Sequence, residues 1–260
     1  MDMKRFSCLP ACAGLVLMLA SGCTVKENRD ACPCLLDILV SGELSSPELV
    51  VNISDDTAPR LKEVVRLDGD NRHHCTSVPR CVASLCAFCR NGGLEISGNR
   101  ILISPGCQSD SLYAHHAYVD CTGESAFAEV HPLKQFASIY LRVMSEAYAL
   151  RPGDEVLVTG NICGYDMETD SPVRGEFRYS TRLDDDMSCV FRVPRQLDGS
   201  LSLSIVTSSD SYSFAAGEQI VRAGYDWQED ALKDILLDID LARMGIEVSV
   251  EDWTVIPVQG

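Results

Sequence analysis

The sequence predicts an all-β protein built from two β-sandwich domains in tandem. Segments in which Val, Ile and Leu alternate with polar residues recur along the whole chain. Gly, Pro, Asn and Asp interrupt these segments about every 8–12 residues, a spacing typical of β-sandwiches. No strand–helix–strand alternation appears, so a parallel, doubly wound sheet is not expected. The 260 residues suit two domains of about 100–150 residues each.

The first half of the chain contains six segments with strand character. Each is a short run of aliphatic or β-branched residues that ends at turn-forming residues. The first run, for example, ends at Ser41-Gly42, and the fifth ends before Pro105-Gly106. In order, the six segments are 35–40, 48–53, 82–88, 93–97, 101–103 and 117–120.

The second half continues the pattern with strands expected at 138–143, 155–160, 175–179, 188–193, 201–206 and 246–250. Its tail is ambiguous between helix and strand. Acidic residues alternate with Ile235, Leu237 and Ile239, which favours a short turn of helix over 228–233 followed by a strand. The domain boundary is expected near 129–133, which gives domains of 32–130 and 131–260.

The first 22 residues have the layout of a secretory signal peptide. Lys4 and Arg5 precede an apolar stretch over 11–20, and small residues follow that stretch. Such a layout directs export and is removed from the mature protein. The apolar stretch is shorter than the roughly 20 residues that a membrane-spanning helix requires. We therefore expect residues 1–22 to be cleaved from an exported protein.

The cysteine that follows the small residues predicts a lipid anchor. The run from Leu19 to Cys23 resembles the bacterial lipobox. We therefore expect cleavage between Gly22 and Cys23 and acylation of Cys23, with palmitate among the fatty acids. Residues 23–31 would then tether the first domain close to the lipid surface, because eight extended residues reach only about 26–29 Å. An ordinary secreted protein with an incidental cysteine is the alternative.

The remaining cysteines predict disulfides. Of the thirteen cysteines, ten follow Cys23: Cys32, Cys34, Cys75, Cys81, Cys86, Cys89, Cys107, Cys121, Cys163 and Cys189. An even number in an exported chain is compatible with disulfides, although the sequence does not choose among the many pairings. Eight of the ten lie between Cys32 and Cys121, so we expect the bridges mainly in the first half.

Three patterns have spacings found in metal sites, but none predicts one. The three cysteines in 81–89 are spaced like iron–sulfur ligands, yet an exported protein has no access to cytosolic cluster assembly. The histidines in 73–75 and 115–116 would suit zinc, but neighbours on a strand face opposite sides and polar flanks indicate exposed loops. The acidic run 166–170 lacks the Gly and Glu of a calcium loop and indicates a hairpin turn.

Composition and motifs also exclude several functions. A net charge of −16 argues against a nucleic-acid-binding protein, because phosphate contacts require clustered Lys and Arg. The G-x-S-x-G, H-E-x-x-H, G-x-G-x-x-G and P-loop motifs do not occur. We therefore expect no catalytic residues and no cofactor.

Several short segments, taken in their order and spacing, resemble one family. They are Asp30-Ala31-Cys32-Pro33, Ser104-Pro105-Gly106, Leu112-Tyr113, Leu133-Lys134-Gln135-Phe136-Ala137, Gly160-Asn161-Ile162-Cys163-Gly164-Tyr165-Asp166, Pro172-Val173-Arg174-Gly175-Glu176-Phe177-Arg178, Phe191-Arg192-Val193-Pro194-Arg195-Gln196 and Gly224-Tyr225-Asp226-Trp227. Together they resemble the FimB-type fimbrial anchor lipoproteins of anaerobic Gram-negative bacteria. The likeness extends over about residues 23–253, nearly the whole mature chain.

The resemblance implies an outer-membrane lipoprotein with two transthyretin-like sandwiches at the base of a type V pilus. Its partners would be fimbrial shaft subunits, bound by β-strand addition. Residues 35–40 would be a first strand that is retained because the lipid is attached just before it. The segment Trp253-Thr254-Val255-Ile256 would either be donated to a neighbouring subunit or form the last strand of the second domain.

Two other roles fit the same fold. A surface adhesin for a host glycan or protein would require exposed aromatic residues on one face. The chain offers few of them, since Trp227 and Trp253 are its only tryptophans. A tip or shaft subunit would require a proteolytic cleavage site between the lipid and the first strand. Arg29 is the single arginine of the tether and the candidate site for such cleavage.

Overall fold

The computed structural model describes residues 32–42, 44, 46–55, 59–67, 72–89, 95–97, 99–145 and 150–251. The strands of the first half are β1 (Cys34–Val40), β2 (Glu48–Ser54), β3 (Pro59–Arg66), β4 (His73–Val78), β5 (Val82–Cys89), β6 (Glu95–Ser97), β7 (Arg100–Leu102), β8 (Tyr113–Asp120) and β9 (Ser125–Val130). The second half contains β10 (Leu133–Lys134), β11 (Phe136–Met144), β12 (Glu155–Asp166), β13 (Ser171–Arg182), β14 (Ser188–Pro194), β15 (Ser202–Val206), β16 (Ser211–Phe214), the helix α2 (Ala216–Arg222), β17 (Asp234–Asp240) and β18 (Gly245–Glu251).

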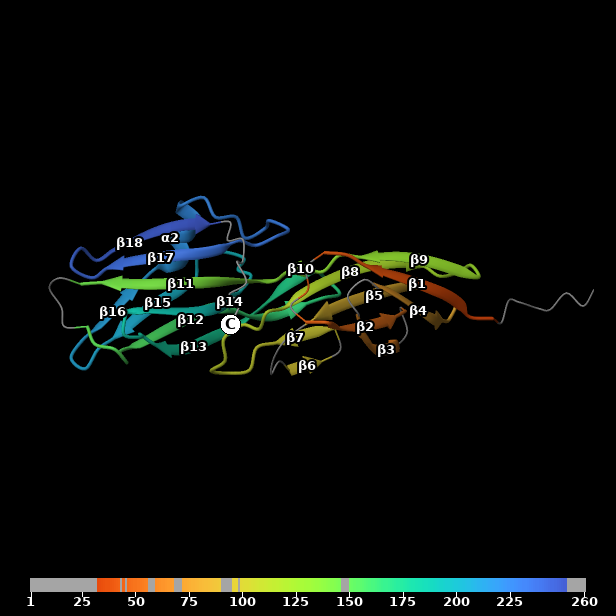
Figure 1. Cartoon of the computed structure of the whole chain (residues 1–260), viewed down its shortest axis with the longest axis horizontal. Helices are drawn as coiled ribbons and strands as arrows, with labels where there is room; N and C mark the ends of the chain where they lie inside the picture. Colours follow the sequence, from red (N-terminus) through yellow and green to blue (C-terminus); the bar gives the residue numbers. More distant parts are fainter. Residues whose placement is uncertain are drawn as a thin grey trace, which may run out of the picture. The chain divides into compact units, whose positions relative to one another are not determined.

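The first half folds into a β-sandwich, which we call the first sandwich. One sheet has the order β4-β1-β9 and the other β10-β8-β5-β2-β3 (Figure 1). Strand alternation explains the packing: Leu36 and Ile38 point inward from β1, and Leu49, Val51 and Ile53 point inward from β2. These side chains belong to one buried cluster between the two sheets. The predicted all-β sandwich fold is therefore confirmed.

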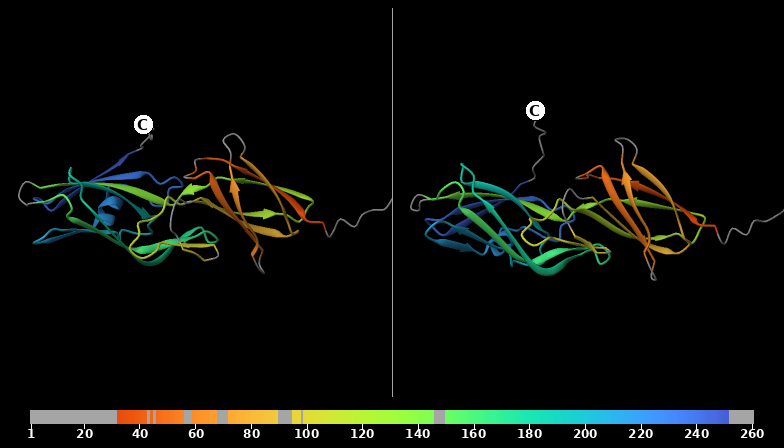
Figure 2. Two further views of the ribbon diagram at one scale, coloured as in Figure 1. Left: turned by 60° about the horizontal axis from the view of Figure 1, so that its bottom comes forward. Right: turned by 90° about the horizontal axis from the view of Figure 1, so that it is seen from below.

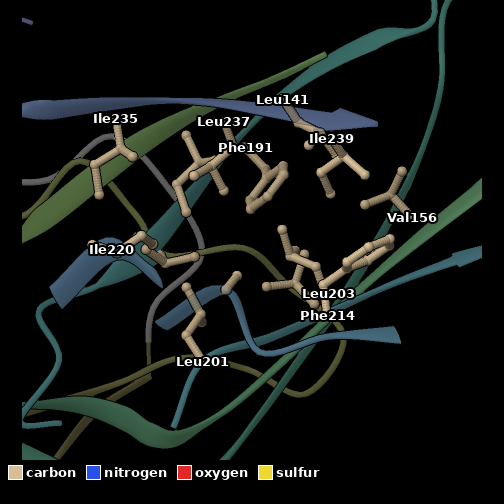
Figure 3. Packing of buried hydrophobic residues seen from close by; sticks show 14 of the residues in the cluster. Leu141, Val156, Phe191, Leu201, Leu203, Phe214, Ile220, Ile235, Leu237 and Ile239 are labelled. Atoms are coloured by element: carbon tan, nitrogen blue, oxygen red, sulfur yellow. The ribbon is translucent and has the colours of Figure 1, made fainter. Parts of the chain in front are cut away.

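The second half folds in the same way and forms the second sandwich. Its sheets have the orders β14-β11-β17-β18 and β16-β15-β12-β7-β6, with β13 paired to β12. Figure 3 shows Phe191, Leu203 and Ile239 meeting in its core. Ile220 of α2 enters the same cluster, so the helix (blue in Figure 2) packs against this core.

The two sandwiches repeat one topology. In each, the first strand lies between an antiparallel partner and a parallel one: β1 between β4 and β9, and β11 between β14 and β17. In each, the second strand pairs with the third and with the fifth, as β2 does with β3 and β5 and β12 does with β13 and β15. β18 adds an edge strand to the second sandwich.

The segment 95–102 crosses between the two halves. β7 pairs with the end of β12, although it precedes the boundary expected near 129–133. A Cβ on Gly164 would lie 2.2 Å from the carbonyl oxygen of Ile101, so this close approach requires glycine. A third buried cluster, which includes Phe88, Ile101 and Tyr165, fills the same region. The domain boundary therefore stays a prediction, because Pro33 and the described residues after it form one compact unit.

Two local predictions are wrong. No helix forms over 228–233, which is a turn; the helix of the described chain is α2. The backbone carbonyls of Trp227 and Glu229 accept hydrogen bonds from the Arg195 side chain, which holds this segment in a turn. The segments 73–75 and 115–116 are not loops, because they belong to β4 and β8.

Candidate assembly site around the first strand

β1 fills the centre of its sheet. It pairs antiparallel with β4 from Cys34↔Val78 onward and parallel with β9 as far as Val40↔Val130. Its four inward side chains, Cys34, Leu36, Ile38 and Val40, are all buried. Residues 35–40 therefore form a central strand of the first sandwich, and the retention of this strand in the mature protein stays a prediction.

The backbone of β1 is also fixed at both ends. At the start, the amide of Leu35 donates to the carbonyl of Glu124 at 2.9 Å, and at the end the amide of Ser41 donates to Val130 at 2.8 Å. A partner strand could replace β1 only by breaking two ladders and emptying the core positions. With β1 in place, the two neighbouring strands β4 and β9 are already paired at this position of the sheet.

The outer face of β1 is open. Leu35 is 51% exposed, and Phe127 on the neighbouring β9 is 58% exposed. Beside them, Asp37 contacts the His73 ring at 3.2 Å and accepts a hydrogen bond from the Cys75 thiol at 3.5 Å. The bond to Asp37 raises the pKa of the Cys75 thiol, which keeps that exposed thiol protonated. This face carries two exposed apolar side chains beside an acidic group.

Polar contacts between β3 and β4 join the edges of the two sheets of the first sandwich beside β1. Glu63 of β3 accepts a hydrogen bond from Thr76 at 3.2 Å and contacts the His74 ring at 2.7 Å. Because β3 and β4 belong to different sheets, these contacts join the two layers at their edge. Sequence patterns do not reveal this contact, since the polar flanks of 73–75 indicate a loop.

The far end of the described chain is an edge strand. β18 pairs only with β17 among the described strands, and Ile246, Val248 and Val250 alternate along it with polar residues. The strand predicted at 246–250 is therefore confirmed. The candidate donor residues Trp253, Thr254, Val255 and Ile256 lie outside the described residues.

The anchor residues Gly22 and Cys23 also lie outside the described part of the chain, so lipidation stays a prediction. Among the described residues, no helix has the length and apolarity needed to cross a membrane.

The ten later cysteines all lie within the described residues, and none of them takes part in a disulfide. Cys34, Cys86, Cys89, Cys121 and Cys189 are buried. Cys32, Cys75 and Cys107 are exposed, and Cys81 and Cys163 are partly buried. Burial raises the pKa of Cys86 to about 11 and that of Cys189 to about 12, so these thiols stay protonated at neutral pH.

The candidate metal patterns do not converge in the described chain. Cys86 and Cys89 are three residues apart on β5 and face opposite sides of the sheet: Cys89 packs in the core of the first sandwich, and Cys86 in the cluster shared with Tyr165. The described residues contain no group of three or more acidic, His or Cys side chains placed to hold a metal. The run 166–170 is the predicted hairpin turn, closed by the pair Asp166↔Ser171.

Three solved structures share this fold. The fimbrial anchor protein Mfa2 from Porphyromonas gingivalis aligns with a TM-score of 0.58 at 11% identity, over 85% of this chain and 98% of that chain. A candidate adhesin from Bacteroides ovatus gives 0.57 at 13% identity, over 86% and 95%. A candidate adhesin from Bacteroides thetaiotaomicron gives 0.56 at 9% identity, over 85% and 97%. No protein-family model and no curated protein sequence matches this chain.

These likenesses define the class of fold to which the chain belongs. It is the fold of a fimbrial anchor and of candidate adhesins, and each alignment spans nearly the whole of the other chain. The fold expected from the family resemblance is therefore confirmed.

Proposed function

We propose that this chain is an outer-membrane lipoprotein that anchors the base of a fimbria. In this role its N-terminal lipid holds the membrane, and its two sandwiches bind a fimbrial shaft subunit by β-strand addition. The observation that carries the proposal is the buried, fully paired β1. A subunit whose first strand is retained has no groove for a donor strand, which suits the end of a fimbria rather than its middle.

The role is structural and not catalytic. The chain must then give its neighbour a strand or a sheet edge, since it does not accept one at β1. The C-terminal segment Trp253–Gly260 follows the edge strand β18 and is the candidate donor. Pro257 lacks an amide donor, so it would lie at the end of the paired region.

The rival role as a glycan-binding adhesin is less well supported by the described residues. Trp227 is only 3% exposed, and its ring packs edge-on against Tyr225 with centroids 4.7 Å apart. It is therefore part of the core of the second sandwich and offers no stacking surface for a sugar.

Deletion of Trp253–Gly260 tests the donor role. If the segment is donated, the shortened protein should keep its β-rich circular dichroism and cooperative unfolding but fail to capture purified shaft subunits in a pull-down. A matched variant, Leu35→Ser with Phe127→Ser, changes the open face of the first sandwich and should capture normally. Undiminished capture by the folded, shortened protein would refute donation from this end. Unfolding of the second sandwich would instead show that the segment is its own last strand.

A further inference from the structure

Two cysteines from different sheets meet inside the first sandwich. Cys34 is the first residue of β1, and Cys121 directly follows β8, which belongs to the opposite sheet. Both are 0% exposed and lie in the same core cluster. The amide of Leu35, the residue after Cys34, donates to the carbonyl of Glu124, shortly after Cys121, so the backbone brings the two cysteines together; the Cys34 thiol is also among the groups that raise the pKa of Cys121. A disulfide needs Cβ atoms about 3.5–4.5 Å apart, so only cysteines that are neighbours in the fold can form one.

A third cysteine, Cys81, also lies beside Cys121 and contributes to the raised pKa of its thiol. The carbonyl of Cys81 accepts the Cys121 amide at 2.9 Å, which places its backbone next to Cys121. Its thiol, however, donates to the carbonyl of Pro79 at 3.4 Å. Because the Cys81 thiol is bonded to Pro79, Cys34 is the preferred partner of Cys121.

We propose that Cys34 and Cys121 form a disulfide that joins the two sheets of the first sandwich when the chain folds in an oxidising compartment. The oxidant is a small-molecule or protein disulfide, R–S–S–R. The thiolate of one cysteine attacks a sulfur of the oxidant and releases one RS⁻ group. The second cysteine then attacks the mixed disulfide and releases the other. Two protein thiols lose two hydrogens, and the oxidant becomes two RSH molecules.

The bond forms during folding and not after it. Burial, together with the neighbouring Cys34 and Cys81 thiols, raises the pKa of Cys121 to about 12. In the folded core Cys121 is therefore protonated and inaccessible, and a thiol must be ionised and accessible to attack an oxidant. Once formed, the bond is shielded from reductants for the same reason.

The location gives the bond a role at the base of a fimbria, a consequence that rests on the proposed function. Cys34 is the point at which the chain enters the fold after the predicted lipid tether. Force on the tether would pass through the bond into β8 of the opposite sheet and not peel β1 from its neighbours. The bond would also prevent β1 from being exchanged for the strand of another subunit.

Mass mapping of the unmodified protein tests the bond without any assumption about fimbriae. The full-length protein is refolded with oxidised glutathione, unfolded in N-ethylmaleimide without reductant, digested and analysed. We expect one linked peptide pair containing Cys34 and Cys121, which disappears when the sample is reduced first. A link from Cys121 to Cys81, or alkylated thiols at both Cys34 and Cys121 in folded protein, would overturn the proposal.

Unfolding measurements provide a second readout with a matched control. Because the bond constrains the unfolded chain, oxidised protein should have an unfolding equilibrium constant roughly 30- to 700-fold smaller than reduced protein. Cys121→Ala should abolish this redox dependence. Cys189→Ala, which removes a buried thiol from the second sandwich, should retain it. A redox dependence that survives in Cys121→Ala, or its absence in the parent, would contradict the proposed pair.

Discussion

Arg195 shows how a single side chain fixes a segment far away in the sequence. It is buried, and its guanidinium donates to the Gln135 side chain at 2.7 Å and to the carbonyls of Trp227 at 2.6 Å, Glu229 at 2.9 Å and Lys134 at 3.1 Å. The planar group presents donors in several directions at once, which an ammonium group does not. Arg195 thus joins the start of the second sandwich to the turn before β17.

Arg195→Met should therefore lower the free energy of unfolding by at least about 3 kcal/mol. The substitution keeps much of the buried stem but removes the donor from the buried Gln135 side chain and Trp227 carbonyl and from part-buried carbonyls beside them, at about 1–3 kcal/mol for each buried unsatisfied group. Arg195→Lys should restore only part of the loss, and Arg182→Met, which alters an exposed arginine, should cost less than about 0.5 kcal/mol. Urea titration of the three variants measures these differences. A cost for Arg195→Met no larger than that of the exposed control would show that the network adds no stability.

His115 makes the stability of the first sandwich sensitive to acid. Its Nε2 atom is buried and has no hydrogen-bond partner among the described residues. Burial lowers the pKa of His115, and the opposing hydrogen bond to the His131 backbone and the charge of Asp170 do not reverse this direction. Since the pKa is lower in the folded state, the unfolded chain binds the proton first. The contribution of neutral His115 to the free energy of unfolding is therefore fully present above about pH 6.5, and it is lost as the pH falls through the pKa of the folded state.

His115→Gln should reduce this acid sensitivity. The amide is neutral at every pH and can keep a polar contact with the backbone of His131. Urea unfolding at about pH 8 and about pH 5 should show a smaller loss of stability in the variant than in the parent. An equal loss in the two proteins would mean that other groups govern the acid response.

At the scale of the elements, alternation predicted the strands with apolar inward faces. β1, β2, β5 and β17 have such faces, and their positions follow from the sequence. β3 and β4 are mostly polar because they lie at sheet edges, although Val65 of β3 and Val78 of β4 enter the core of the first sandwich. The sequence does not predict α2, because it is a single short helix. Its Gly217 packs closely against Gly199: a Cβ on Gly217 would lie 2.6 Å from the carbonyl oxygen of Gly199. The positions of β3, β4 and α2 therefore depend on contacts between segments that are distant in the sequence.

The two faces of β1 provide a matched test of its role in the fold. Leu36 is fully buried, whereas the adjacent Leu35 is half exposed. Leu36→Ala should cost about 2–5 kcal/mol, because it leaves a cavity between the sheets, and Leu35→Ala should cost less than about 0.5 kcal/mol. Chemical denaturation compares the two directly. Similar small costs would show that β1 is not an integral strand of the core.

At the scale of the whole molecule, the repeated topology was not visible in the sequence. β1 and β11 hold equivalent positions but share no obvious residue pattern, because many aliphatic combinations fill the same core position. The position of the first strand could be predicted, because its apolar residues alternate with polar ones before the turn at Ser41-Gly42. Its partners β4 and β9 could not, because parallel pairing with β9 joins residues about 90 apart in the sequence, as in Leu35↔Ser125.

The cysteines illustrate the same limit at this scale. Their number and the export signal predict bridges, but only the fold brings Cys34 and Cys121 together from opposite sheets. The other buried thiols show why a count alone is misleading. Cys189 lies in the core of the second sandwich and Cys86 in the cluster around Tyr165, where each acts as a small apolar side chain.

The central claim is that the lipid on Cys23 holds a fimbria to the cell, and Cys23→Ala tests it most directly. In the bacterium that produces the chain, fimbriae and this protein are quantified in the cell-bound fraction and in the medium, with Cys32→Ala as the matched control. Because the acylated cysteine is the proposed attachment to the bilayer, fimbriae should appear in the medium with this protein attached, while the control keeps them on the cells. Fimbriae that stay cell-bound in Cys23→Ala, in amounts equal to the control, would contradict the anchoring role.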